Sequence, residues 1–188
     1  MVIKPLFSEE EVLEGCCRED EKSQYHLYNH FSKKMLGIAM RYSSAKQEAE
    51  DILQDSFVKV FKNIKKFKKE CPLEQWIRKI VVNTALTYHR KKTELADIDD
   101  FKNLLSTENI SLSHIHYQDL VSMIQTLATS YRLVFNLYAI EGYQHKEIAS
   151  LLNISEGASK SLYARAKSIL QNKIKLNTKR ENWLENNK

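Results

Sequence analysis

Apolar residues recur at spacings of three and four along most of the chain, which is the period of an amphipathic helix. One such series predicts a helix over about residues 22–43: Leu27, Phe31, Met35, Ile38 and Tyr42. A second series predicts a helix over about residues 45–67: Ala49, Ile52, Leu53, Phe57, Val60, Phe61 and Ile64. No segment alternates with a convincing strand period, and the chain has only 4 Gly and 2 Pro. The pattern predicts an all-α fold.

Start and stop signals place two further helices. Ser8 precedes three consecutive glutamates, which is typical of a capped helix start, and that helix runs to about Cys17. Pro72 precedes another helix, which runs to about Lys92 with these residues on its buried side: Trp76, Ile77, Ile80, Val81 and Ala85. The segment 65–72 before it is predicted to be a loop, and it contains Lys65, Lys66, Lys68 and Lys69.

Residues 142–170 predict two short helices in tandem. Ile148, Leu151 and Leu152 form the apolar face of the first, Asn153 closes it, and Ser155 caps the second. The second helix carries Lys160, Arg165 and Lys167. This is the pattern of a helix-turn-helix, whose second helix fits the major groove of DNA. An ordinary helical hairpin with a solvated basic face is the alternative.

The charge is distributed in blocks. The formal net charge is +5, yet residues 59–92 alone carry +9 and residues 144–180 carry +6, while residues 93–119 between them carry −5. Two basic blocks on either side of an acidic one indicate two modules that grip one polyanion at two places. A chain of 188 residues with 43% hydrophobic residues can build two small cores. We therefore predict helical domains over residues 8–92 and 119–176, an acidic linker over 93–118, and a polar tail over 177–188.

Composition excludes several classes of protein. The chain has no apolar run of about 18 residues and no signal-type amino terminus, so we expect a soluble, cytoplasmic protein. Cys16, Cys17 and Cys71 lack the paired spacing of disulfide frameworks or zinc sites. They are interpreted as reduced, partly buried thiols, with a redox role as the alternative.

The lysine-rich loop and the helix after Pro72 together suit single-stranded DNA. The outer face of that helix presents amide, hydroxyl and cationic side chains: Gln75, Arg78, Lys79, Asn83, Thr87 and Arg90. Cations can follow the phosphate backbone, aromatic rings can stack on unpaired bases, and an Asn can read a base edge. The alternative is a solvated amphipathic helix, with Trp76 in the core.

Two sequence blocks resemble those of a known family. The runs AEDILQDSF (residues 49–57) and WIRKIVVNTA (76–85) look like the second conserved region of bacterial sigma factors. Residues 142–165 look like their fourth region. The chain is most similar to the small extracytoplasmic-function (ECF) group, which lacks the third region. The resemblance extends from Leu13 to Leu170, with the two blocks in the family's order.

The resemblance implies a function and a set of contacts. A sigma factor is a dissociable, non-catalytic subunit, without a cofactor, that directs RNA polymerase core enzyme to promoter DNA. Its acidic helix binds core enzyme, here through Asp51, Gln54 and Asp55. Its minus-ten residues would be Lys65, Lys66, Lys68, Lys69, Arg78, Lys79, Asn83, Thr87 and Arg90. Its minus-thirty-five residues would be Lys146, Lys160, Ser161, Ala164, Arg165 and Lys167.

The resemblance implies two further features. The acidic linker, with Glu94, Asp97, Asp99 and Asp100, would thread polymerase channels as an RNA mimic. An anti-sigma protein is a common partner in the family. The chain also departs from the family in the recognition helix. Leu162 stands where a second Arg is frequent, and Ser159 and Tyr163 replace inward aliphatic residues, so a rotated helix is one alternative.

Two other functions are weighed against a sigma factor. A stand-alone helix-turn-helix regulator would dimerise on a palindrome, and the sequence shows no dimerisation helix. A metal-dependent nuclease would need a ligand cluster. His26 and His30 are spaced i, i+4, and His114 and His116 flank Ile115, but neither pair has a carboxylate cluster beside it. These histidines are better interpreted as ordinary surface or core residues.

Overall fold

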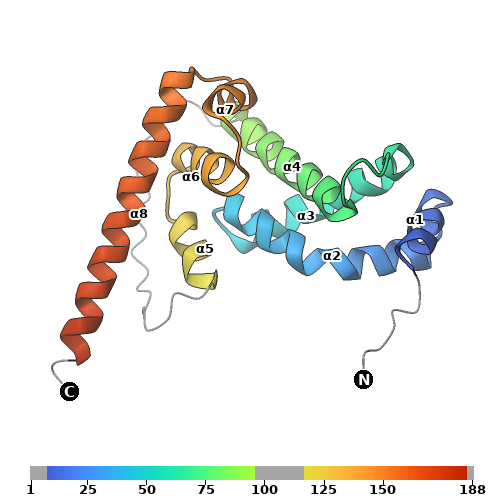
Figure 1. Cartoon of the computed structure of the whole chain (residues 1–188), viewed down its shortest axis with the longest axis horizontal. Helices are drawn as coiled ribbons and strands as arrows, with labels where there is room; N and C mark the ends of the chain where they lie inside the picture. Colours follow the sequence, from blue (N-terminus) through green and yellow to red (C-terminus); the bar gives the residue numbers. More distant parts are fainter. Residues whose placement is uncertain (1–7, 96–116, 186–188) are drawn as a thin grey trace. The chain divides into compact units, whose positions relative to one another are not determined.

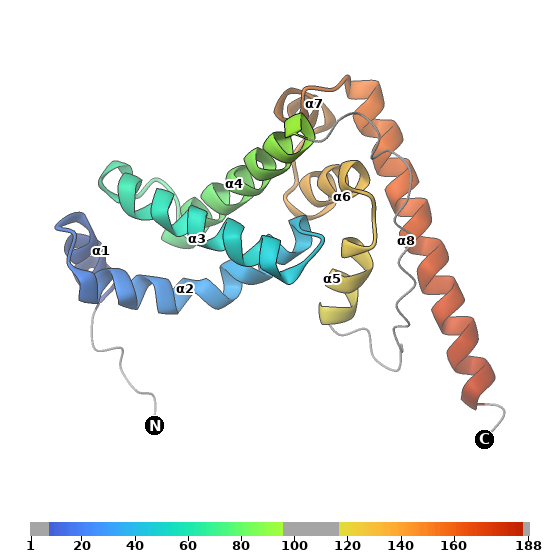
Figure 2. The same ribbon diagram turned by 180° about the vertical axis from the view of Figure 1, so that it is seen from behind.

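The computed structural model describes the backbone of residues 8–95 and 117–185, with side chains described over 8–92 and 120–176. Every regular element in these residues is helical (Figures 1 and 2), as the sequence predicts. In chain order they are α1 (Glu9–Cys17), α2 (Glu21–Tyr42), α3 (Lys46–Asn63), a 3-10 turn (Ile64–Lys66), α4 (Leu73–Leu95), α5 (Tyr117–Gln125), α6 (Thr129–Phe135), a π-helical turn (Asn136–Ile140), α7 (His145–Leu152) and α8 (Glu156–Glu185).

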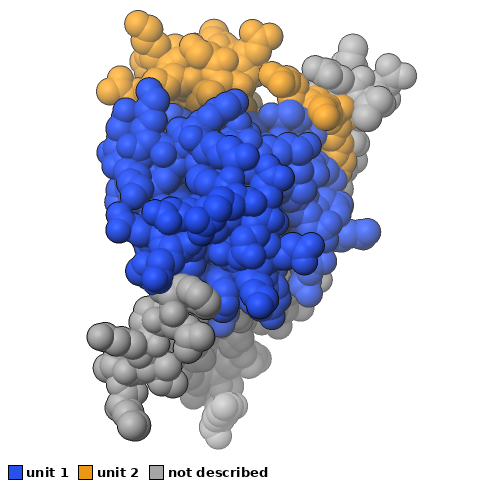
Figure 3. Space-filling model, turned by 90° about the vertical axis from the view of Figure 1, so that its right-hand side faces the viewer, with its two compact units in different colours: residues 1–39, 46–88 blue, residues 40–45, 89–188 orange. Residues whose placement is uncertain are grey.

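The residues group into two compact units, coloured separately in Figure 3. Unit 1 comprises the chain through Ala39 together with Lys46–Tyr88. Unit 2 comprises Met40–Ala45 and the chain from His89 onward. Residues 96–116, most of the predicted linker, lie outside the described residues. The domain limits predicted above stay predictions.

The start of α1 has the capping geometry that the sequence indicates. Ser8 Oγ accepts a hydrogen bond from Glu11 N at 3.2 Å, and Glu11 Oε2 accepts one from Ser8 N at 2.7 Å. The two interactions satisfy backbone donors that a helix start otherwise leaves open. Later in the same helix, a Cβ atom on Gly15 would overlap the Ser23 hydroxyl. Glycine at this position therefore allows α1 to approach the start of α2.

The core of unit 1 is built from the apolar faces of α2, α3 and α4. All five residues predicted for α2 are at most 8% exposed, as are six of the seven predicted for the third helix, although Tyr42 at the end of α2 is grouped with unit 2. Burying each large aliphatic side chain contributes about 1.5–3 kcal/mol. The exception is Phe61, which is half-buried and contacts the Phe57 ring. On α4, Ile77, Val81 and Ala85 are fully buried.

Three details of this unit differ from the sequence prediction. The third helix ends at Asn63 and continues only as a 3-10 turn, rather than running to residue 67. Phe67 is extended instead, and its ring lies 5.3 Å from that of Trp76. Trp76 and Ile80 are half-buried rather than part of the core. Trp76 packs on the loop side of α4, where Phe67 gives it an apolar neighbour.

The three cysteines are free thiols in the structure, with Cys16 buried and Cys17 and Cys71 half-buried. Burial raises the pKa of Cys16 to about 11. Because the thiolate is the reactive form, this thiol is inert near neutral pH. Its surroundings favour a packing role over a redox role.

The core of unit 2 joins α5 and α6 to α8. Its buried members are Met123, Leu127, Ala166 and Leu170, and its half-buried members are Tyr131, Phe135, Ile169 and Ile174. Lys173 Nζ donates to Thr126 Oγ1 at 2.5 Å, and burial lowers the pKa of this amine. The helical backbone of α8 continues to Glu185, into the segment predicted as a polar tail. The stretch of α8 from Ala166 to Ile174 therefore anchors the helix on this core.

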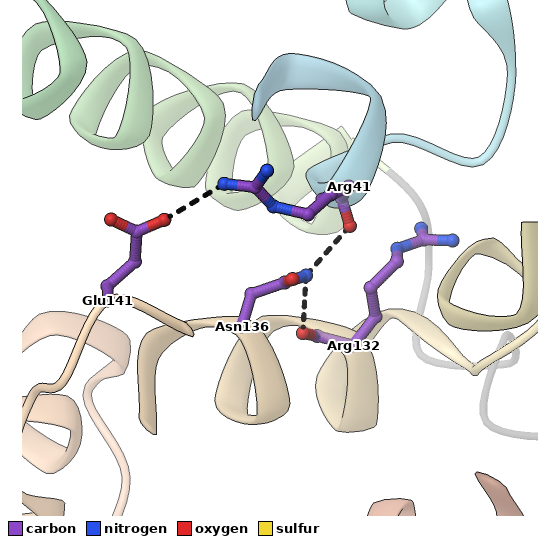
Figure 4. A network of polar contacts seen from close by, with 4 residues as sticks. All are labelled: Arg41, Arg132, Asn136 and Glu141. Atoms are coloured by element: carbon purple, nitrogen blue, oxygen red, sulfur yellow. Dashed lines mark hydrogen bonds and ion pairs between the residues drawn. The ribbon is translucent and has the colours of Figure 1, made fainter. Parts of the chain in front are cut away.

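A buried polar network in unit 2 fixes the π-helical turn (Figure 4). Asn136 Nδ2 donates to Arg41 O at 2.7 Å and to Arg132 O at 2.9 Å. Arg41 Nη2 lies 3.4 Å from Glu141 Oε1, with both side chains largely buried. Buried charges are tolerated when they are paired in this way. Because Glu141 immediately follows the turn, the network also sets the point from which the chain enters α7.

Candidate nucleic-acid interface

The solvent-facing side of α3 begins as an acidic surface. Asp51, Gln54 and Asp55 are all exposed, at i, i+3 and i+4 on the same helix. Among the described residues, no Lys or Arg forms an ion pair with Asp51 or Asp55. Val58, one turn further along this face, is 50% exposed. The surface combines two available carboxylates with an apolar neighbour.

The lysine-rich segment after α3 is exposed, and part of its charge is already paired. Lys65 Nζ lies 3.1 Å from Glu19 Oε1, and Lys69 Nζ lies 3.1 Å from Glu10 Oε1. All four lysines of the segment are exposed. Exposed pairs of this type are worth about 0–1 kcal/mol, so a polyanion can displace either carboxylate. The segment offers a cationic edge whose strength depends on ionic strength.

The outer face of α4 continues this cationic edge. Lys79 and Asn83 are exposed, and Thr87, another turn along, is half-buried. Thr87 Oγ1 donates to Asn83 O at 2.9 Å, so the Asn83 side-chain amide takes no part in that bond. Arg78 is half-buried, and Arg90 is exposed within unit 2. The structure thus presents a cation and an amide side by side on one helical stripe.

In unit 2, α7 and α8 form the helix-turn-helix predicted from the sequence. Asn153 ends α7 in the left-handed conformation, with φ 54°, and Ile154 N donates to Ala149 O at 3.0 Å. Ser155 Oγ accepts a hydrogen bond from Ala158 N at 3.1 Å, which caps α8. Asn tolerates positive φ better than most residues. Of the three residues predicted for the apolar face of α7, only Ile148 is fully buried, and Leu151 is 39% exposed.

The inward face of α8 contains the two residues that depart from an aliphatic pattern. Ser159 is fully buried, and its Oγ lies 2.9 Å from His145 Nδ1. The His145 ring stacks on Tyr138 with ring centroids 4.2 Å apart, and the Tyr163 ring lies 4.5 Å from Tyr138. Histidine supplies the hydrogen-bond partner that a buried serine needs. The helix is therefore not rotated, and Ser159 and Tyr163 are its inward residues.

This register leaves the predicted DNA-facing residues on the surface. All are exposed: Lys146, Lys160, Ser161, Ala164, Arg165 and Lys167. Lys160 Nζ lies 2.6 Å from Glu156 Oε1, one turn earlier on α8. This hydrogen bond holds the pKa of Glu156 below its usual value. The surface is basic, with the carboxylates of Glu147 and Glu156 at its edge.

Two known sequence families match the chain on either side of the undescribed segment. Sigma-70 region 2 matches residues 27–94, and Sigma-70, region 4, matches residues 117–170. The matches cover most of the chain and follow the family's order. The chain belongs to the sigma-70 family of RNA polymerase sigma factors.

Individual relatives of this sigma factor agree with the match. An ECF RNA polymerase sigma-E factor of Haemophilus influenzae is 26% identical, covering 89% of this chain and 95% of the relative. The ECF sigma-E factor of Escherichia coli K12 is 23% identical, over 87% and 92%. The sigma factor RpoE of Bartonella quintana, solved with the anti-sigma factor NepR, has a TM-score of 0.51 at 22% identity, covering 80% and 96%. The last comparison supports the fold.

The surfaces of this sigma factor coincide with the two matched regions. The α3 face, the lysine segment and the outer face of α4 lie within region 2, and the helix-turn-helix lies within region 4. Every described helix is too short or too polar to cross a membrane. Within residues 8–92 and 120–176, no three His, Cys, Asp or Glu side chains gather as a metal site would require. His26 and His30 are exposed on α2, and His114 and His116 lie outside the described residues.

Sequence reasoning missed two features of these surfaces. Val58 follows Asp51, Gln54 and Asp55 at helical spacing, so the same periodicity could have identified an apolar member of that face. The pairing of His145 with Ser159 joins residues 14 positions apart, in two different helices. No local pattern indicates such a contact.

Proposed function

We propose that this ECF-type sigma factor binds RNA polymerase core enzyme through the acidic face of α3. Two exposed carboxylates with no cationic partner among the described residues are the observation that carries the proposal. Exposed charges of this kind attract a basic partner as it approaches and fix how it aligns on the helix. The exposed Val58 beside them supplies the apolar contact that interfaces place among polar groups. The chain itself carries out no chemical reaction, and it acts in the cytoplasm where core enzyme is found.

The lysine segment and the outer face of α4 bind the non-template strand of the minus-ten element in this proposal. Lysines along the edge hold the phosphates, and the free amide of Asn83 reads an extruded base. Extruding a base costs a few kcal/mol, which these contacts offset. The assigned residues are Lys65, Lys66, Lys68, Lys69, Arg78, Lys79, Asn83, Thr87 and Arg90. Among them, Lys79 and Asn83 have the most direct support because both are exposed on one stripe.

Mutations are expected to distinguish phosphate binding by the lysines from base recognition by Asn83 at the minus-ten element. Lys68→Gln with Lys69→Gln should lower affinity for every single strand and reduce the salt slope by about 0.7 for each lost phosphate contact. Asn83→Ala should leave the slope unchanged and reduce discrimination between matched and mismatched minus-ten strands. Only the backbone of Asn83 bonds Thr87, so the substitution preserves that bond. The measurement is fluorescence anisotropy of holoenzyme with labelled oligonucleotides over a salt series.

An equal loss for matched and mismatched strands in Asn83→Ala would assign Asn83 a structural role. The lysine variants serve as its control, because they should weaken both strands equally.

The exposed side of α8 reads the minus-thirty-five element in this proposal, with Lys146 of α7 on a neighbouring phosphate. Lys160, Ser161, Ala164 and Arg165 face one direction, and Lys167 extends the basic edge. Lys160 exchanges its bond to Glu156 for one to DNA. Arg and Lys on a major-groove helix can bond both guanine acceptors, whereas Ala contacts a thymine methyl group.

An anti-sigma protein is a further partner in this proposal. The support is the Bartonella quintana sigma factor, which was solved with such a protein. The acidic residues Asp97, Asp99 and Asp100, proposed to mimic RNA in the polymerase channel, lie outside the described residues, as does the side chain of Glu94.

The proposed function predicts that specific transcription requires both the chain and core enzyme. Genomic DNA fragments are transcribed in vitro with core alone, with the chain alone, and with both, and the RNA 5′ ends are sequenced. Discrete start sites should appear only with both. If the chain instead bound a palindromic site tightly without core enzyme and yielded no start sites with it, a stand-alone regulator would be the correct assignment.

A further inference from the structure

The exposed face of α3 changes from acidic to basic within one turn, between Asp55 and Lys59. A lysine four residues after an aspartate commonly pairs with it on a helix surface. Here the Lys59 ammonium instead lies against α4, with Nζ 3.1 Å from Thr84 Oγ1. The side chain of Lys59 therefore bridges the two helices of unit 1 that carry the polymerase-binding and minus-ten surfaces.

The Thr84 hydroxyl is well placed to orient this ammonium. Thr84 is 3% exposed, and its Oγ1 donates to Ile80 O at 2.8 Å. A hydroxyl has one proton, so with that proton directed to Ile80 the oxygen can accept from Lys59. The ammonium has three N–H donors, of which Thr84 takes one. Two remain for a ligand at the edge of α4, one residue from Asn83.

Lys59 differs from the other lysines of unit 1 whose contacts are defined, because its partner is a neutral hydroxyl rather than a carboxylate. Lys65, Lys69 and Lys34 each pair with a glutamate, so single-stranded DNA must displace a carboxylate from them. Thr84 is neutral. The Lys59 ammonium is therefore held in place without a neighbouring negative charge that offsets its own. It can bind a phosphate without first giving up a carboxylate partner. A side chain that is already ordered also loses less conformational entropy on binding.

We propose that Lys59 is a further DNA-contacting residue, whose Thr84-anchored ammonium binds a backbone phosphate of the non-template strand beside the base read by Asn83. The inference rests on the minus-ten assignment proposed above and extends that site from α4 to α3. The cationic track then has two sides, the lysine segment with α4 on one and Lys59 on the other.

The test compares three variants as holoenzyme with a fluorescent non-template minus-ten strand over a salt series. Lys59→Gln should reduce the salt slope by about 0.7. If the variant and the wild type have the same affinity at 1 M salt, the variant's affinity at 0.1 M salt should be about fivefold lower. Lys33→Gln, at an exposed lysine of α2 in the same unit, is the matched charge control and should match wild type. Thr84→Val keeps the charge, so it should retain the slope and lose less affinity than Lys59→Gln.

Gel filtration with core enzyme first establishes that each variant forms holoenzyme in equal yield. Lys59→Gln binding with the slope and affinity of Lys33→Gln, while the Lys68 and Lys69 variants lower the slope, would overturn the inference and leave the proposed function intact. A Thr84→Val variant that binds like wild type would overturn the anchoring role. Failure of wild-type holoenzyme to bind the strand at all would instead refute the minus-ten assignment itself.

Discussion

Replacing Asp51 and Asp55 together with lysine is expected to abolish binding to RNA polymerase core enzyme. Each substitution reverses a charge that has no cationic partner among the described residues. Losing one partner of a close interfacial charge pair costs about 2–5 kcal/mol, and reversal adds repulsion. Two such changes should weaken binding so far that no complex is detected at micromolar protein concentrations. Co-elution of the variant with core enzyme on gel filtration measures the effect directly.

A matched variant separates this local effect from the change in total charge. Glu14→Lys with Glu21→Lys changes the net charge equally, at exposed acids of α1 and α2 in the same unit. This control should co-elute with core enzyme. Both variants should keep the helical circular dichroism of the wild type, because all four positions are exposed. Undiminished co-elution of the Asp51 and Asp55 variant would rule out the α3 face as the polymerase contact.

Removing Lys160 or Arg165 is expected to impair use of the upstream promoter element specifically. A lost base-edge contact costs about 1–3 kcal/mol, or roughly a 5- to 150-fold loss in affinity. Both side chains are exposed on α8 while Ala166 beside them is buried, so alanine at either site should leave the helix packed. Binding and transcription are measured on a full duplex promoter and on a pre-opened template lacking the upstream element. The loss should appear on the duplex alone.

Lys175→Ala serves as the control for this pair, since Lys175 is exposed further along the same helix. It should behave like wild type on both templates. Should Lys160→Ala and Arg165→Ala weaken the pre-opened template as much as the duplex, α8 would not be the upstream reader. In that case the basic face of α8 would act through general attraction to DNA.

Helical periodicity predicted the core of unit 1 well because burial there depends on local spacing. Leu27, Phe31 and Met35 lie on one stripe of α2, and any packed arrangement must cover that stripe. The same reasoning located the turn of the helix-turn-helix, since Asn153 and Ser155 act on their own neighbours. It failed for Leu151, which is 39% exposed, because periodicity gives the apolar face of a helix but not how much of that face its neighbour covers.

Contacts between distant residues were not predictable from the pattern. Nothing near Ser159 in the sequence indicates that His145 accompanies its burial, so a serine at an inward position made the register of α8 ambiguous. Residues 120–143 contain a π-helical turn held by Asn136, whose partner Arg41 lies 95 positions earlier. Lys59 also belongs to this class, because its orientation depends on the spacing between α3 and α4.

The helix proposed to read the promoter, α8, also carries residues of the unit 2 core. Arg165 and Ile174 belong to one uninterrupted helix and lie about 14 Å apart along its axis. The cluster seats α8 on Met123 and Leu127 over the stretch from Ala166 to Ile174. A tilt of α8 by about 5° about Ile174 would move Arg165 by about 1 Å, which exceeds the roughly 0.5 Å range of good hydrogen-bond distances. Substitutions that change side-chain volume in this cluster are therefore expected to alter promoter preference. New promoter preferences could then evolve while every proposed DNA-contacting residue stays the same.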